Sequence, residues 1–208
     1  MAKWPFSKNP KQYLDRVEQV LVMPFYISFF LRLWPDEIST VNWYVLLLLL
    51  SEGFVIVLVL VRRRTELISV RFRDWAIAFA GSFLVLLVGK GGEPLWIAGG
   101  VILLLVGMAI HMGAKLSLLR SFGLVAADRG LKQQGLYKIV RHPMYAGYIL
   151  THIGYLLVAP SWRNLGLYVA TWLLLTARIF AEERLLSSDP RYKAYMARVQ
   201  YRMLPSVF

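Results

Sequence analysis

The run from Val41 to Val61 constrains the fold of this chain more than any other stretch. Its 21 residues carry a single charged side chain, Glu52, and match the roughly 20 residues that an α-helix needs to cross a bilayer. A segment in hydrocarbon must satisfy its backbone polar groups internally, as an α-helix does. Hydrophobic residues make up 58% of the 208 residues, too many for an ordinary soluble domain. The sequence therefore predicts an all-α, polytopic membrane protein.

Five more segments have the composition of membrane helices. Val17–Trp34 is the least regular, because Glu18, Pro24 and Arg32 interrupt it, and it is predicted as a weak span or a kinked interfacial helix. Together the segments predict a transmembrane helical bundle of five to six spans in a single domain, residues 1–208. The other four segments are Trp75–Val88, Leu95–Met112, Pro143–Ala159 and Leu165–Ala181.

Clusters of lysine and arginine flank these segments, and such clusters stay on the cytoplasmic side of a membrane. One cluster is Arg62–Arg64, and the basic stretch Lys115–Arg141 holds another. Six crossings with both termini in the cytoplasm agree with every cluster, whereas a flat first segment or a re-entrant fifth gives four or five. The tail from Ser187 onward predicts a C-terminal interfacial amphipathic helix, on the headgroups or folded back over the cytoplasmic loop.

Charge and cysteine content exclude several kinds of site. The net charge is +12, but the basic residues flank apolar spans as a bilayer surface requires, so nucleic-acid binding is not expected. The chain has no cysteine, which removes disulfides, thiolate zinc sites and cysteine nucleophiles. His111 and His152 have no paired carboxylate at ligand spacing, so no metal site is predicted and both are expected to bond between helices.

Glu52 is an acid in the middle of an apolar run, where a charged and exposed side chain is costly. We expect it to make an interhelical hydrogen bond or an oligomer contact. The alternative is a functional role, either attraction of a cationic headgroup or closure of a substrate tunnel.

Chemistry-bearing residues first crowd together in Gly135–Gly147, which reads GLYKIVRHPMYAG. Pro143 suits the first position of a helix, because its missing N–H would have no partner there. The free amides of a helix that starts here, beside Arg141 and His142, favour a carboxylate or phosphate. The stretch is predicted to form an anion-binding cradle at a membrane surface.

A second such stretch, Arg178–Leu186, reads RIFAEERLL at the end of the last apolar segment. Arg178 and Glu182 are four residues apart and share one helix face, with Glu183 one step around. Taken alone, this spacing is as typical of a surface ion pair at a helix terminus as of a functional site. Its occurrence together with the first stretch favours a functional site.

These stretches, in this order, resemble the isoprenylcysteine carboxyl methyltransferase and phospholipid methyltransferase superfamily, integral membrane enzymes that use S-adenosylmethionine. The resemblance extends to LLRSFG at Leu118–Gly123, to DPRYKAYMARV at Asp189–Val199 and to the final Leu204 and Pro205, so it covers roughly the last 90 residues. Leu136 departs from the family, which often has proline there. The resemblance implies N-terminal transmembrane helices in residues 1–112 and a cofactor-binding catalytic region in residues 113–208.

The resemblance also implies a binding site for S-adenosylmethionine. Arg141, His142 and the amides after Pro143 would hold the carboxylate of the cofactor, while Tyr137 and Tyr145 would wall its adenosine or its sulfonium. Either of the two acids in the second stretch would accept hydrogen bonds from the ribose or the α-amine of the cofactor. Those acids are Glu182 and Glu183.

The methyl acceptor decides the catalytic roles of Arg178, Glu182 and Glu183. A carboxylate acceptor needs no base, and Arg178 would hold it by bidentate hydrogen bonds. An amine or hydroxyl acceptor must lose a proton, which one of the two acids or His142 would accept. The expected acceptor is lipophilic and enters from the bilayer. It is most like an isoprenylcysteine carboxylate, with phospholipid amines and small thiols as alternatives.

Two other functional classes are weighed against a methyltransferase. A sterol-reductase-like enzyme shares an RHP-type motif but uses NADPH, and it would need more spans and more basic residues for the 2′-phosphate. A transporter or membrane scaffold is the non-enzymatic alternative. Transporters usually show paired interrupted helices in two halves, and this sequence has no such symmetry.

Overall fold

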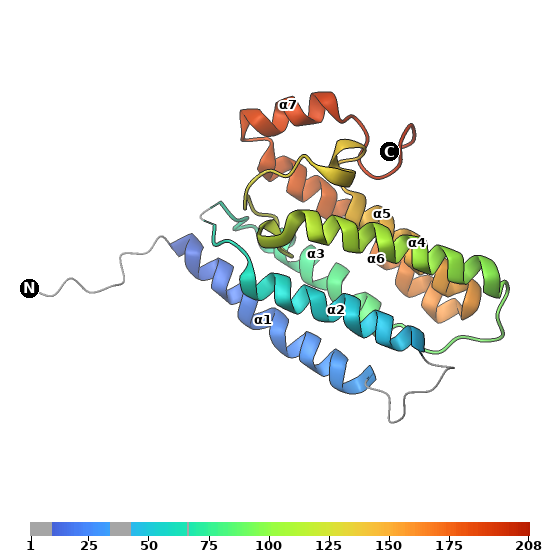
Figure 1. Ribbon diagram of the computed structural model, residues 1–208. Coiled ribbons are helices and arrows are strands. Elements are labelled where there is room, and N and C mark those ends of the chain that lie inside the picture. The colour runs from blue at the N-terminus through green and yellow to red at the C-terminus, as the bar shows by residue number, and fades with distance from the viewer. Residues whose placement is uncertain (1–9, 34–42, 66) are drawn as a thin grey trace, which may run out of the picture.

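The computed structural model describes residues 10–33, 43–65 and 67–208. Within these ranges the chain is helical except for loops and one isolated antiparallel bridge between Ile68 and Ala127, which confirms the all-α prediction. Figure 1 shows the long helices lying roughly along one axis, with α7 crossing over one end. The α-helices are α1 (Pro10–Leu33), α2 (Trp43–Val61), α3 (Phe72–Phe83), α4 (Ile97–Leu118), α5 (Pro143–Val158), α6 (Trp162–Leu186) and α7 (Pro190–Arg198). Short 3₁₀ helices are η1 (Leu84–Leu87), η2 (Leu119–Ser121) and η3 (Gly135–Lys138).

Glycines bring α4 and α5 together backbone to backbone. A Cβ added at Gly107 would lie 2.7 Å from the carbonyl oxygen of Gly147, and one added at Gly147 would lie 2.7 Å from that of Gly107. Gly100 and Gly154 repeat this arrangement further along, with distances of 2.9 and 2.7 Å. Small residues allow membrane helices to approach this closely. The pair fixes the start of α5, and therefore the RHP motif, against the end of α4.

α4 is longer than the sequence predicts. Leu95–Met112 was expected, because Lys115 reads as the first cation of a loop, but α4 continues to Leu118. Lys115 is fully buried, and its Nζ lies 5.3 Å from the centre of the Tyr148 ring on α5. A cation over an aromatic face is attracted to it, so a lysine can belong to a helix interface.

The last long helix also exceeds its predicted bounds of Leu165–Ala181. α6 begins at Trp162, where the Ser161 hydroxyl accepts a hydrogen bond from the amide of Asn164, and it ends at Leu186. Glu182 and Glu183 therefore lie on a helix, and their orientation follows from its rotation.

α1 begins at Pro10, before the predicted start at Val17, and carries Asp15 and Glu18 into the interior. The polar start of this segment suggested a surface location. Two arginines from distant parts of the chain bond to these acids, Arg62 and Arg129, which explains the difference.

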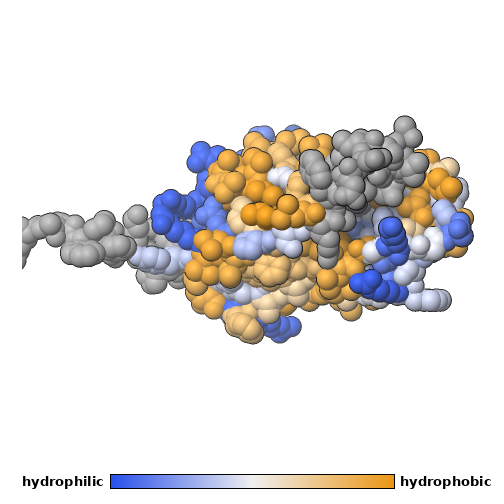
Figure 2. All heavy atoms as spheres, turned by 90° about the horizontal axis from the view of Figure 1, so that it is seen from below, coloured by the Kyte–Doolittle hydropathy of each residue, from blue (hydrophilic) through white to orange (hydrophobic). Residues whose placement is uncertain are grey.

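Two helices of the described structure, Ile97–Ser121 and Trp162–Leu186, are long and apolar enough to cross a membrane. Figure 2 shows apolar side chains over most of one face and hydrophilic ones gathered toward its two ends, as expected where the middle of a protein lies in lipid. The number of crossings, the cytoplasmic orientation and the interfacial position of the tail stay predictions. So does the role of Glu52, whose side chain lies outside the described residues.

Candidate functional site

His142 and Pro143 start α5 as the motif predicts. Pro143 is at the helix start, and His142 is the preceding cap residue with φ −129° and ψ 57°. The carbonyl of His142 accepts hydrogen bonds from the amides of Tyr145 at 3.2 Å and Ala146 at 3.3 Å. The bond of Ala146 is the ordinary first bond of the helix, but the amide of Tyr145 was expected to be free for an anion, so the helix start offers fewer free donors than the sequence suggested.

Arg141 is buried and bonds to three protein groups through its Nε and Nη1. Its Nε donates to Glu183 Oε1 at 2.8 Å, and its Nη1 donates to the carbonyls of Val199 and Gln200, both at 2.7 Å. The backbone amide of Arg141 also donates to the carbonyl of Tyr201 at 2.9 Å. Arg141 therefore ties the RHP motif to α6 and to the segment that follows α7, which is part of the tail that the sequence placed on the headgroups or folded back over the cytoplasmic loop.

Glu183 lies at the centre of an ionic cluster. One of its carboxylate oxygens bonds to Arg141 Nε and to His142 Nε2 at 3.2 Å, and the other accepts from Arg202 Nε at 3.0 Å. Its side chain is 6% exposed. With three bases around it, Glu183 holds the two motifs and the tail together.

Glu182 is the acid that faces the cavity. Its Oε1 accepts from the Tyr145 hydroxyl at 2.5 Å and from Arg178 Nε at 3.1 Å, while its Oε2 lies 3.7 Å from His142 Nδ1. Its side chain is 21% exposed, against 6% for Glu183. The rotation of α6, which the sequence left open, therefore presents Glu182 to the pocket.

Arg178 is buried one turn before Glu182. Besides Glu182 it donates to the carbonyl of Gly123 at 2.9 Å and to the Ser82 hydroxyl at 3.4 Å. Its guanidinium carbon lies 5.4 Å from the centre of the Tyr145 ring. Arg178 thus supports the site from behind Tyr145 and Glu182 and does not line the pocket.

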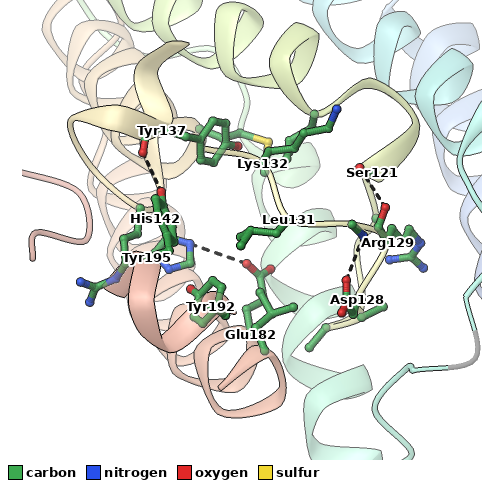
Figure 3. Close-up of a pocket in the computed structure, with 18 of the residues that line it drawn as sticks. Ser121, Asp128, Arg129, Leu131, Lys132, Tyr137, His142, Glu182, Tyr192 and Tyr195 are labelled. Atoms are coloured by element: carbon green, nitrogen blue, oxygen red, sulfur yellow. Dashed lines mark hydrogen bonds and ion pairs between the residues drawn. The ribbon is translucent and has the colours of Figure 1, made fainter. Parts of the chain in front are cut away.

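One pocket collects these groups, with about 880 Å³ of empty space when its open mouth is included. Figure 3 shows His142, Glu182 and Tyr192 on one flank and Asp128 and Arg129 on the other. The walls come from the end of α4 and the segment after it (118–132), from η3 and the start of α5 (137–145), and from the end of α6 to α7 (182–195). Polar and aromatic side chains from three parts of the chain thus converge on one concave site, as in small-molecule binding sites.

Three tyrosines of the pocket wall keep their protons at physiological pH. Burial raises the pKa of the Tyr137 hydroxyl well above its usual value, and burial raises the pKa of Tyr195 to about 12. Burial, followed by the nearby Glu183, also raises the pKa of Tyr192. The Tyr195 hydroxyl donates to the carbonyl of Tyr137 at 2.7 Å, which packs α7 against η3. The aromatic wall is therefore neutral.

The structure brings all the sequence-predicted site residues to one end of the bundle, in two groups. The pocket lining includes Tyr137, Arg141, His142, Tyr145 and Glu182. The lining does not include Pro143, Arg178 and Glu183.

Residues 125–132 also line the pocket, and the sequence assigned them no role beyond a basic loop. Tyr192 and Tyr195 line it as well. The signals that could have found them are LLRSFG, which precedes residues 125–132, and DPRYKAYMARV, which contains both tyrosines.

The two histidines outside the motifs differ from each other. His152 bonds between helices as expected, because its Nδ1 accepts from Trp172 Nε1 at 3.1 Å. His111 packs its ring 4.9 Å from the Tyr148 ring, and its Nδ1 has no hydrogen-bond partner within the described ranges. In the same ranges no three His, Asp or Glu side chains gather as metal ligands would.

Comparisons with known proteins agree with the motifs. Residues 95–189 match the model of the phospholipid methyltransferase family. Among solved structures, the chain is similar to the eukaryotic intramembrane Ras methyltransferase, an isoprenylcysteine carboxyl methyltransferase solved without a monobody, with 18% identity and a TM-score of 0.48 over 92% of this chain and 86% of that one. No curated protein matches the sequence. The family match runs from just before α4 to the N-cap of α7 and includes both motifs, which confirms the predicted resemblance to the superfamily of membrane methyltransferases that contains the phospholipid and isoprenylcysteine carboxyl methyltransferases.

Proposed function

We propose that the protein is an S-adenosylmethionine-dependent methyltransferase that acts at the cytoplasmic membrane face on a lipophilic acceptor. The observation that carries this proposal is that one pocket is lined by residues of both motifs, His142 and Tyr145 from the first and Glu182 from the second. Methyl transfer requires aligned reactants and exclusion of water rather than a covalent nucleophile. Helix ends and an aromatic wall line this pocket and can align two reactants in it.

The residues of the pocket fit the cofactor by their chemistry. When bound, S-adenosylmethionine supplies a methyl group on a positively charged sulfonium. The carboxylates of Glu182 and Asp128 and the ring of Tyr145 suit a cation, and they line the pocket. Lys132 also lines it and suits the carboxylate of the cofactor, as does Arg141, although Nε and Nη1 of Arg141 already donate to protein groups.

The acceptor that the geometry supports best is one that loses a proton, such as a lipid amine or a thiol. Glu182 faces the pocket, and its Oε1 is held by the Tyr145 hydroxyl and Arg178 Nε. A fixed carboxylate beside the acceptor can take that proton as a general base. The same negative charge would repel an acceptor carboxylate.

A carboxylate acceptor, like that of an isoprenylcysteine, is the second candidate. It is favoured by the buried Arg178, whose guanidinium carbon lies 5.4 Å from the Tyr145 ring at the pocket wall. For this acceptor Arg178 would have to leave the Gly123 carbonyl or Glu182, to which it now donates. The present contacts therefore rank it below a proton-losing acceptor.

The test compares the wild-type protein with Glu182→Gln in detergent and in vesicles. Calorimetry with S-adenosylmethionine, S-adenosylhomocysteine and NADPH comes first, and transfer of a labelled methyl group to a phosphatidylethanolamine, a long-chain thiol and an isoprenylated cysteine follows. We expect the wild type to bind the first two ligands. Glu182→Gln should lower transfer to the amine or thiol by about 10²- to 10⁴-fold, the contribution of a general base.

Each other outcome has a separate meaning. Glu93→Gln changes an exposed acid and is the matched control, which should transfer as the wild type does. Methyl transfer only to the isoprenylated carboxylate, unaffected by Glu182→Gln, would establish the second candidate. Binding of NADPH alone would indicate a reductase. Binding of none of the three ligands would favour a transporter or scaffold.

A further inference from the structure

A buried cluster of four charges connects the N-terminal helix to the site. Asp15 and Glu18 lie one turn apart on α1, and their side chains are 1% and 0% exposed. Arg62 follows α2 directly, and its Nη1 lies 2.9 Å from Glu18 Oε1. Arg129 Nη2 lies 2.7 Å from Asp15 Oδ1 and 3.0 Å from Glu18 Oε2. A buried ion cluster is weak evidence for stability alone, because desolvation offsets the attraction, so its position needs another explanation.

Glu18 also binds the backbone of the segment after α4. Its Oε1 accepts from the amides of Leu124 at 2.6 Å and Val125 at 3.1 Å. Arg129 lies so close to Gly123 that a Cβ there would be 2.1 Å from Nη1. The α1 cluster, defined as Asp15, Glu18, Arg62 and Arg129, therefore fixes both ends of residues 123–129.

The same segment is held on another edge by residues 65–69. The Ser69 amide donates to the carbonyl of Ala126 at 2.9 Å, and the Asp128 amide donates to the carbonyl of Leu67 at 2.8 Å. The Thr65 hydroxyl donates to the carbonyl of Asp128. Contacts to residues before α3 thus clamp the segment from two directions.

This clamped segment is one wall of the pocket. Residues 125–130 line it, and Figure 3 shows Asp128 and Arg129 opposite Glu182 and His142. The carbonyl of Gly123 in turn accepts from Arg178, which holds Glu182. The α1 cluster is therefore connected to both flanks of the pocket, although α1 lies outside residues 95–189 of the family match.

We propose that Glu18 is a positioning residue of the cofactor pocket, acting through Arg129 and the amides of Leu124 and Val125. The proposal rests on the proposed function. It assigns α1 a role in ligand affinity, because the carboxylate of Glu18 is one of the two charge partners of Arg129 and accepts hydrogen bonds from two amides of the 123–129 wall. A displacement of this wall would misalign the groups bound against it, although Glu18 itself does not touch them.

The experiment uses Glu18→Gln in the full chain, with S-adenosylhomocysteine as the calorimetric ligand. We expect its affinity to fall about tenfold, the order that a wall displaced by a fraction of an ångström produces. Amide hydrogen exchange without ligand should become faster at residues 123–130 and stay unchanged at residues 100–112. The matched control is Asn164→Ala, a fully buried residue that bonds Gly89 in the loop between η1 and α4. It should lower the melting temperature yet leave the affinity within twofold.

The outcomes separate the two proposals. Wild-type affinity in Glu18→Gln, or an equal loss in Asn164→Ala at matched melting temperature, would overturn the positioning role and leave the proposed function standing. If the wild type does not bind S-adenosylhomocysteine, the proposed function fails first, and the positioning role fails with it. Should Glu18→Gln not fold, Arg62→Lys replaces it, because Arg62 touches Glu18 but does not line the pocket. The same readouts and thresholds then apply.

Discussion

The α4/α5 pair and the segment 123–129 that follows α4 are held in opposite ways. Between α4 and α5 the backbones touch at glycines, and no charge is involved at Gly107 and Gly147. The 123–129 segment is held by the buried charges of the α1 cluster and by single hydrogen bonds to residues 65–69. The stability of the first interface should therefore depend on side-chain volume and that of the second on charge. Substitutions can test the two separately.

Removing one charge from the α1 cluster should have the largest effect on stability. Arg62→Met leaves two buried carboxylates with Arg129 alone, and such an unbalanced buried charge costs about 3–5 kcal/mol. Chemical unfolding in detergent measures it. The control is Arg191→Met, which removes a pair whose arginine side chain is 77% exposed and should change little. Equal losses in both variants would contradict the charge-held description.

One added carbon should have the next largest effect, at the glycine contact. A Cβ at Gly147 would lie 2.6 Å from the amide nitrogen of His111, so Gly147→Ala must push α4 and α5 apart and should cost about 1–3 kcal/mol. Gly166→Ala on α6 is the matched control, because nothing lies within 4 Å of the new carbon. There the change should stabilise the helix by roughly 0.5–1 kcal/mol. Thermal unfolding of both variants checks the difference in sign.

Low pH should lower the stability of the fold through Asp74, and this effect should be smaller than the two above. Burial raises the pKa of the Asp74 carboxyl, but hydrogen bonds from Ser69 and Arg184 outweigh it and hold that pKa below the usual 3.8. Because the folded pKa lies below the unfolded one, the stability from Asp74 is present above pH 3.8 and is lost as pH falls through the folded pKa. Melting temperatures from pH 2.5 to 6 should fall less steeply in Asp74→Asn than in the wild type. If the melting temperatures of the two proteins fall equally steeply as the pH decreases, this account is wrong.

The sequence predicted the helices and the pairing of the two motifs, because apolar length and local spacing determine both. Helix ends were less predictable, since Lys115 lies inside α4 with its ammonium group over the Tyr148 ring of α5, a contact that the sequence does not reveal. Which glutamate faces the pocket depends on the rotation of α6, which distant packing decides.

Long-range partners could not be predicted from one sequence. Glu18 bonds to Arg129, 111 residues away, and Arg141 bonds to the carbonyls of Val199 and Gln200, 58 and 59 residues away. No local pattern marks such a pair. The sequence therefore predicted the tail only as an amphipathic helix, on the headgroups or folded back over the cytoplasmic loop, although its backbone completes the environment of the RHP motif.

The glycine contact between α4 and α5 also determines which parts of the pocket can move. Where carbonyl oxygens meet glycines, no side chain can change rotamer to make room, so α4 and α5 move as one rigid body. The 123–129 segment is clamped from two directions, so we expect the pocket to adjust to an incoming ligand at α7. The RHP motif at the start of α5 is expected to stay in place against α4.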